Sequence, residues 1–303
     1  MSLFSHFIFI NLLYVFGIGL NIVFLRFLSL HFDPLNNNGV RFLAGSVVLL
    51  LLILWRFRSS LIQLARSPKL IAITLFVGLM MSANMYFWLK GVKITNAVTA
   101  SIFGVLAMPF GVIIAAIFFQ DERQKIKYKA FWFGSLLTII GSLGFVWYGK
   151  TLAIEEGFLL GSFFLFLSIV IRNIQNLMVK FSKGLNVFTL SCVTSLTTSF
   201  SSLLLSQQAG KFDEIFTTPS WLMFCLIAVG IYAILVGMVL TFHIIQTQGL
   251  VAYQVLELLM PVSTAIMAYL ILGEHISLMQ IVFAFIVMLG ASIALKLVKF
   301  QKK

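Results

Sequence analysis

The chain alternates long apolar runs with short polar breaks from end to end. Ten of the runs approach the ~20 residues that an α-helix needs to cross the hydrocarbon core of a bilayer. A strand with an open edge cannot satisfy its backbone hydrogen bonds in lipid, so we interpret all ten runs as helices. The predicted spans are 6–30, 36–55, 70–89, 95–119, 130–148, 157–179, 187–206, 221–245, 248–272 and 278–298. The pattern predicts an all-α integral membrane protein with ten transmembrane helices.

The second half of the chain repeats the first. Residues 95–123 and 247–275 align without a gap at a constant offset of 152 residues (247 minus 95). The identical pairs include Thr95/Thr247, Ala100/Ala252, Leu106/Leu258, Met108/Met260, Pro109/Pro261, Ile114/Ile266, Ala116/Ala268 and Glu122/Glu274. Because five spans per copy is an odd number, the second copy must enter the membrane in the opposite direction. We expect two inverted five-helix repeats, 1–149 and 150–303, with a substrate site near the bilayer midplane where they meet.

Composition and charge agree with a membrane location. Hydrophobic residues make up 61% of the chain and charged residues 10%, against about 25% charged in soluble proteins. If the N-terminus is cytoplasmic, fourteen cations fall on inside loops: Arg56, Arg58, Arg66, Lys69, Arg123, Lys125, Lys127, Lys129, Lys180, Lys183, Lys296, Lys299, Lys302 and Lys303. The outside loops then hold Lys90, Lys93, Lys150 and Lys211. The positive-inside rule predicts both termini in the cytoplasm, with the protein in a bacterial inner (plasma) membrane.

Other function classes find little support in the sequence. No soluble stretch is long enough to carry a nucleic-acid-binding face. The segment 144–151 has the letters of a phosphate-binding loop, but it follows a predicted membrane helix and contains aromatic side chains that would fill the cradle. The chain has no HExxH or G-x-S-x-G motif, and its histidines lie near span ends. Cys192 and Cys225 fall inside predicted spans. We therefore expect neither an enzyme nor a bound metal or cofactor.

Glu257 is the one acidic residue predicted to lie deep in the membrane. It is about 13 Å along its helix, near the middle of a core about 30 Å thick. An ionised carboxylate at that depth is costly unless it is paired or takes up a proton. Tyr253, Gln254, Pro261 and Thr264 lie three, four and seven residues away and share its helix face. This polar face fits either a binding or proton-carrying site or a hydrogen bond within a packed interface.

Two arginines and two prolines are further candidates, as ion-pair partners and as helix breaks. Arg41 is a candidate ion-pair partner for Glu257, or its side chain reaches the outer surface instead. Arg172 lies near the cytoplasmic end of its span, and we expect it to extend to that surface. Pro109 and Pro261 each free a backbone carbonyl at equivalent positions of the two repeats. They either break their helices or are tolerated as ordinary kinks.

Several segments resemble one known family. They are Thr95-Asn-Ala97, the run through Pro109 to Asp121-Glu122-Arg123, its second copy Thr247…Leu256-Glu257…Pro261…Gly273-Glu274-His275, and Arg41-Phe42-Leu43-Ala44-Gly45. These segments are similar to the EamA-type transporters of the drug/metabolite transporter superfamily, over the whole chain in length and topology. The resemblance implies a cavity lined by spans one to four and six to nine, with spans five and ten at the periphery. Where the family has Glu-Pro in the fourth span, this chain has Met108-Pro109, so Glu257 stands alone.

These features together predict a secondary transporter of small organic metabolites, such as amino acids, that exports them by alternating access. Glu257 is the candidate for binding a proton or the substrate amine. The expected lining comprises Gln254, Tyr253, Asn84 and Tyr14, with Trp88 as an aromatic wall. The expected partners are a small-molecule substrate, a coupling proton and the lipid bilayer, without nucleic acid, for a monomer or homodimer. The alternatives are a metabolite importer, a multidrug efflux carrier or, in another class, a membrane scaffold that transports nothing.

Overall fold

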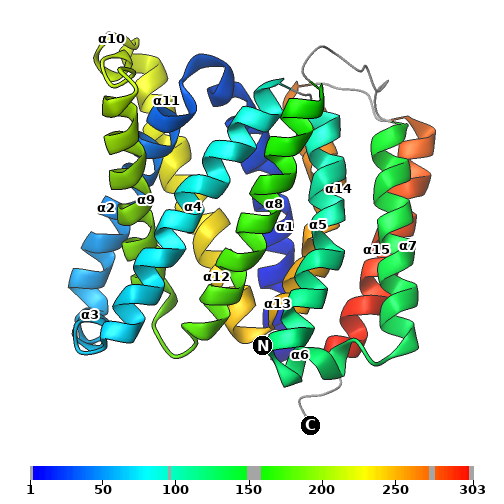
Figure 1. Cartoon of the computed structure of the whole chain (residues 1–303). Coiled ribbons are helices and arrows are strands. Elements are labelled where there is room, and N and C mark those ends of the chain that lie inside the picture. Colours follow the sequence, from blue (N-terminus) through cyan, green and yellow to red (C-terminus); the bar gives the residue numbers. More distant parts are fainter. Residues whose placement is uncertain (1–2, 95–96, 149–157, 273–276, 300–303) are drawn as a thin grey trace.

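The computed structural model describes residues 3–94, 97–148, 158–272 and 277–299, and the regular elements in these residues are helices (Figure 1). The first half contains α1 (Leu3–His31), α2 (Pro34–Arg56), α3 (Arg58–Ala65), α4 (Pro68–Ile94), α5 (Ala97–Phe118), α6 (Gln120–Lys125) and α7 (Lys129–Trp147). The second half contains α8 (Phe158–Phe181), α9 (Val187–Gln208), α10 (Glu214–Thr217), α11 (Ser220–Tyr232), the π-helix η1 (Ala233–Val239), α12 (Leu240–Thr247), α13 (Leu250–Glu257), α14 (Met260–Leu272) and α15 (Leu278–Lys299).

In the described residues, each predicted apolar run is mostly helical, in one helix or in consecutive helices with short breaks. Six helical segments are long and apolar enough to cross a membrane, and the bent pair α13–α14 makes a seventh if it counts as one span. The helices α7 and α15 add two shorter apolar segments. The first helix begins and the last helix ends at the same end of the bundle, where α3 and α6 also lie (Figure 1). We call this the terminus-side end.

The outer surface of the bundle is strongly apolar. Large hydrophobic side chains are exposed on helices from both halves, among them Trp55, Phe133, Leu159, Phe200, Phe224 and Phe285, each more than half exposed. A soluble protein rarely exposes so many large apolar side chains on all sides, because each one in contact with water costs free energy. Polar side chains gather inside instead, including buried asparagines of α2 and serines of α9. This distribution fits a bundle surrounded by lipid.

The helix α9 is rich in Ser and Thr, yet it forms a continuous helix packed between α2 and α4. Some of its hydroxyls bond back along the helix, as Ser195 does to the carbonyl of Ser191 at 2.7 Å. Others donate to neighbouring backbones: Ser199 reaches the carbonyl of Gly39 at 2.8 Å, and Thr198 reaches that of Gly78 at 2.9 Å. The helix is stable in an apolar setting because these donors have carbonyl partners.

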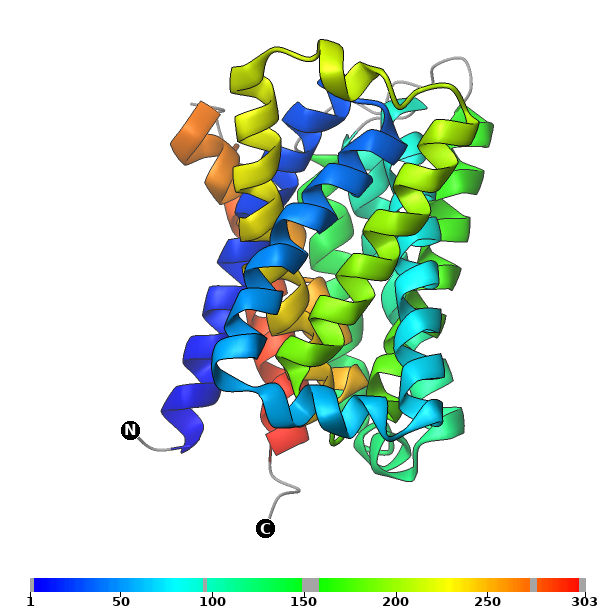
Figure 2. The ribbon, with the colours of Figure 1, turned by 90° about the vertical axis from the view of Figure 1, so that its left-hand side faces the viewer.

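The bundle has two opposite edges. The helices α7 and α15 pack along each other at one edge (Figure 1). The helices α2 and α9 lie side by side on the opposite face, which Figure 2 presents to the viewer. The remaining long helices lie between these two pairs, and buried charged side chains occur on α2, α6, α8 and α13.

The closest approach of α4 to α9 depends on Gly78. A Cβ atom at this position would lie 2.5 Å from Cβ of Thr197 and 2.9 Å from the carbonyl oxygen of Thr194. We predict that Gly78→Val separates the two helices and lowers the free energy of unfolding by about 1–3 kcal/mol, the usual cost of overpacking. Thermal unfolding of the purified protein in detergent measures this effect. Leu79→Val, at an exposed neighbouring position, is the control, and equal melting temperatures for the two variants would contradict the prediction.

Candidate functional site

A cavity of about 230 Å³ lies in the middle of the bundle, between α1, α2, α4, α8, η1, α12, α13 and α14. Most of its wall is apolar, with a limited set of polar groups, as in many small-molecule sites. The polar lining residues are Tyr14, Asn21, Arg41, Asn84, Arg172, Gln175, Asn176, Thr241, Tyr253, Glu257 and Thr264. Among the described side chains, none from α5, α7, α9 or α15 lines it. The resemblance implies that spans four and seven also line the cavity, which is not seen for the described side chains of α9 and of the second half of α5; the side chains of 97–106 lie outside the described residues.

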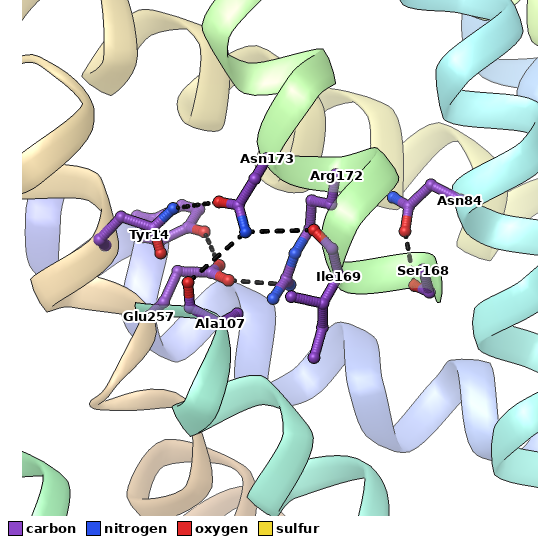
Figure 3. Close-up of polar contacts among 9 residues, drawn as sticks. Tyr14, Asn84, Ala107, Ser168, Ile169, Arg172, Asn173 and Glu257 are labelled. Carbon is purple, nitrogen blue, oxygen red and sulfur yellow. Dashed lines mark hydrogen bonds and ion pairs between the residues drawn. The ribbon is translucent and has the colours of Figure 1, made fainter. Parts of the chain in front are cut away.

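Glu257 lies at the centre of a polar cluster in this cavity (Figure 3). Its side chain is 4% exposed, and one carboxylate oxygen lies 2.8 Å from a guanidinium nitrogen of Arg172. The other oxygen accepts a hydrogen bond from the hydroxyl of Tyr14 at 2.9 Å. The ring of Tyr253 packs against that of Tyr14, with 6.1 Å between their centroids. The carboxylate is thus neutralised by a cation and also held by a hydroxyl from the other half of the chain.

The helix that carries Glu257 breaks at the next residues. The axes of α13 and α14 form a bend of 43°, and Pro261 follows the break as the second residue of α14. Proline has no amide hydrogen, so the carbonyl of Glu257, four residues earlier, lacks its usual helical donor. Ser142 of α7 donates to the carbonyl of Leu258 at 2.9 Å within the break. A discontinuous helix at a binding cavity is common in secondary transporters.

Pro109, at the equivalent position of the first repeat, behaves differently. The helix α5 runs from Ala97 to Phe118 without interruption, so a break at Pro109 is not seen. A missing amide removes one hydrogen bond, and a helix packed among others tolerates that loss when the neighbouring bonds persist. The break at the site is therefore a property of the second repeat alone.

A second polar layer lies behind the carboxylate. Gln254 does not line the cavity. Its amide donates to Asn173 Oδ1 at 2.8 Å, and Asn173 in turn donates to the carbonyl of Ile169 at 3.1 Å. Gly111 of α5 makes room for this pair, because a Cβ there would lie 2.0 Å from Nε2 of Gln254. Gln254 thus joins α13 to α8 one layer away from the cavity.

The other residues expected at the site do face the cavity. Tyr14, Tyr253 and Glu257 line it together, and Asn84 and Trp88 line it from α4. Asn84 accepts a hydrogen bond from Ser168 of α8 at 2.7 Å, which ties α4 to α8 (Figure 3). The structure therefore gathers five of the six expected lining residues around one space.

Neither arginine takes the role that the sequence suggested, because Arg172 pairs with Glu257 and Arg41 is buried without reaching that carboxylate or the surface. Arg172 does not extend to the cytoplasmic surface but pairs with Glu257, because its side chain faces the cavity where a carboxylate is within reach. Arg41 makes no ion pair among the described residues. Its guanidinium binds Asn38 Oδ1 at 3.0 Å and approaches the sulfur of Met85 at 3.9 Å. A usable signal was present, since Arg172, Gln175 and Asn176 share one face of a helix.

The wall opposite α4 contains the π-helix η1. Four of its seven residues, Ala233, Ile234, Gly237 and Met238, line the cavity. Such segments are rare, occur often at functional sites and place an extra residue in one turn. No local pattern predicts this π-helix, because it lies inside a uniformly apolar run.

A second charged cluster closes the terminus-side end of the bundle between the two halves. Glu122 of α6 is fully buried and pairs with Lys180 of α8. Its two carboxylate oxygens also accept the backbone N–H groups of Leu250 at 2.9 Å and Val251 at 3.3 Å, the first residues of α13. These amides lack partners within their own helix, and a negative charge at a helix N-terminus is favourable. We call Glu122, Lys180 and the start of α13 the clasp.

Further contacts surround the clasp. Lys180 also reaches Asp121 at 2.7 Å and lies 4.3 Å from the ring centroid of Phe119. Beside it, Asn11 of α1 and Gln248, just before α13, exchange two amide hydrogen bonds of 3.2 and 2.7 Å. Both sets of contacts join the first half of the chain to the second. They therefore hold the halves together at the terminus-side end.

With this geometry in place, comparisons with known proteins become informative. The EamA-like transporter family matches the chain twice, over residues 6–147 and 158–296. The chain belongs to this family. An uncharacterized transporter of Haemophilus influenzae is 40% identical over 292 residues, which cover 95% of this chain and 96% of that protein. This EamA-like chain is therefore a membrane transporter by family.

A solved crystal structure supports the fold separately. It aligns with this EamA-like chain at a TM-score of 0.67 and 16% sequence identity, covering 93% of this chain and 96% of the other. At that identity the likeness concerns the arrangement of helices alone.

The ion pair at the site generates a stability prediction. Arg172→Gln leaves the buried carboxylate of Glu257 without its cation and should lower the free energy of unfolding by about 3–5 kcal/mol. Glu257→Gln leaves Arg172 without its anion and should also destabilise. The double variant should lose much less than the sum of the two, because no unpaired charge remains. Denaturant unfolding in detergent measures the cycle. Lys183→Gln, in an exposed loop, controls for net charge, and strictly additive losses would contradict the pairing.

Proposed function

We propose that this protein is a secondary transporter of small organic metabolites, amino acids or related compounds, and that it exports them by alternating access. The observation that supports this most is the central cavity. Its wall contains a buried carboxylate, the guanidinium that pairs with it and a helix break. Its volume of about 230 Å³ suits a small metabolite and is below the ~300–1,000 Å³ of typical drug-sized sites. Glu257, Tyr253, Tyr14, Asn84 and Trp88 form the proposed binding surface, with Gln254 positioning α13 from behind.

The proposed architecture is ten transmembrane spans in two inverted five-helix repeats, 1–149 and 150–303. Contacts between the helices support it. In this scheme α1 corresponds to α8, α2 to α9, and α5 to the pair α13–α14. The packing of α1 on α14 then matches that of α8 on α5, and α4 on α9 matches α11 on α2. We further propose that the protein resides in a bacterial inner membrane with both termini in the cytoplasm, in line with the positive-inside rule.

The clasp supplies one gate of the proposed cycle. It closes the terminus-side end, while the cavity lining extends along α1 from Tyr14 to Leu25 and along α4 from Met81 to Val92. Both stretches run toward the helix ends that lie away from the termini (Figure 1). The conformation therefore fits an outward-facing state. To face inward, the halves must separate at Glu122 and Lys180 and close at the opposite end.

The buried position of Glu257 supports a proposal of proton coupling. A proton on this carboxylate removes its charge and with it the attraction for Arg172, which frees the guanidinium. Loss of the negative charge on Glu257 and release of the positive charge on Arg172 both change which substrate charge the cavity prefers. Protonation can thus couple to substrate binding without a second ion site.

A scaffold without transport activity is the alternative from another class. It has no need for a cavity with a buried ion pair, and it predicts no response to metabolites. The test is a metabolite panel screened for thermal stabilisation of the purified protein, followed by flux of the stabilising compounds in proteoliposomes. Transport requires both stabilisation and flux down an imposed gradient. Failure of every compound in both assays would favour the scaffold.

The coupling role of Glu257 makes a separate prediction. In proteoliposomes, Glu257→Gln should abolish the dependence of flux on an imposed pH gradient, because the amide cannot exchange a proton. Flux driven by the substrate gradient alone should fall but remain measurable if the protein folds. Gln208→Glu, at the exposed end of α9, serves as the control for a carboxylate placed elsewhere. If Glu257→Gln still transports with undiminished proton dependence, another group couples transport to protons.

The clasp makes its own prediction. In Glu122→Gln the neutral side chain holds the amides of Leu250 and Val251 less tightly, so their hydrogen exchange should become faster. Hydrogen-exchange mass spectrometry in nanodiscs measures this over the start of α13. Asp121→Asn is the matched control, because Asp121 also pairs with Lys180 but its side chain is 61% exposed, whereas that of Glu122 is fully buried. Equal exchange in the two variants would remove Glu122 as the helix-terminal anion.

A further inference from the structure

Arg41 is a buried cation that faces the cavity and has no acidic partner among the residues that the structure describes. Its residue is 2% exposed, and it lines the cavity from α2. Among the described residues its contacts are the amide oxygen of Asn38, the sulfur of Met85 and the ring of Phe42, 5.1 Å from the guanidinium carbon. Its Nε makes no hydrogen bond. A buried charge with so little compensation is costly, so its retention calls for an anion that arrives from outside.

The net charge of the cavity lining indicates how much negative charge the expected anion should have. The charged side chains among the described lining residues are Arg41, Arg172 and Glu257. Arg172 and Glu257 neutralise each other, which leaves one positive charge at Arg41. A carboxylate supplies one negative charge in a planar shape that a guanidinium can bind with two hydrogen bonds. A phosphate monoester would bring a charge of about −1.5 to −2 and leave an excess of negative charge.

Other unpartnered groups describe the rest of the ligand. Asn21 Oδ1, Gln175 Oε1 and Asn176 Nδ2 are buried without a hydrogen-bond partner, and all three residues line the cavity. Buried polar atoms are nearly always satisfied, so these three call for partners, which a bound solute in the cavity would supply. Two acceptor oxygens suit an ammonium or hydroxyl donor beside the carboxylate. The aromatic ring of Trp88 and the apolar wall remain for a side chain.

Resting on the proposed transport function, we infer that Arg41 binds the carboxylate of the substrate. The geometry that supports this is the buried unpaired guanidinium facing the same cavity as the three unsatisfied amides. The substrate class is then small 2-amino or 2-hydroxy acids. In this assignment Arg172 pairs with Glu257, the proposed proton carrier, whereas Arg41 binds the substrate.

The test uses matched pairs of compounds: phenylalanine with phenylalaninamide, leucine with leucinamide, and lactate with lactamide, together with phenyl phosphate as the phosphate arm. Half-maximal concentrations for thermal stabilisation, and for competition in proteoliposome flux, give the preference of acid over amide. The wild type should prefer each accepted acid by about tenfold or more, the value of a charge-assisted hydrogen-bonded contact. Arg41→Gln should lose this preference, and Arg41→Lys should keep part of it. Lys183→Gln should match the wild type.

The outcomes separate the possible failures. A purely structural role for Arg41 would weaken acids and amides alike and leave their ratio unchanged, and that result overturns the inference. Equal binding of acids and amides by the wild type overturns it too, as does tighter binding of phenyl phosphate, but both leave transport intact. If Arg41→Gln does not fold, the ratio in Arg41→Lys decides, and an unchanged ratio there counts against the carboxylate. A wild type that neither binds nor moves any compound contradicts the proposed function itself.

Discussion

A carboxylate inside an apolar bundle has to be neutralised at the place where it is buried, and this requirement organises the centre of the protein. Glu257 is held by Arg172 from α8 and by Tyr14 from α1, so one side chain draws together helices from both halves. The helix break before Pro261 orients α13 toward this cluster. Because the pair is buried, any event that changes its charge, such as protonation, also changes how the surrounding helices are held.

The same principle operates at the terminus-side end of the bundle. Glu122 is buried there with a lysine and with the unpaired amides of a helix start. The two acidic residues thus differ in their surroundings. Glu257 faces a cavity open to a solute, and Glu122 joins the two halves directly. In the proposed cycle the first arrangement binds the solute and the second closes one end of the bundle, as alternating access around a central site requires.

The sequence predicted the helices and most of the cavity for simple physical reasons. Apolar runs of membrane length specify spans, and a lone acid at mid-depth specifies where a polar site must be, which located Glu257, Tyr253 and Tyr14. The partner of that acid was assigned incorrectly. Whether Arg172 extends to the surface or pairs inside depends on which way its helix faces; the polar face that it shares with Gln175 and Asn176 hints at this direction but does not show which acid the arginine reaches. The π-helix η1 and the inward turn of Arg41 likewise arise from packing between distant helices, which leaves no local pattern.

The most direct test of the account is accessibility of the cavity from both sides of the membrane. Thr264 lines the cavity, so a Thr264→Cys variant, with Cys192 and Cys225 replaced by alanine, reports on it through a membrane-impermeant thiol reagent. Alternating access predicts labelling from either side, in right-side-out and in inside-out vesicles, with a transported substrate changing the ratio of the two. Labelling from one side only, unaffected by every solute, would contradict a transport cavity around Glu257.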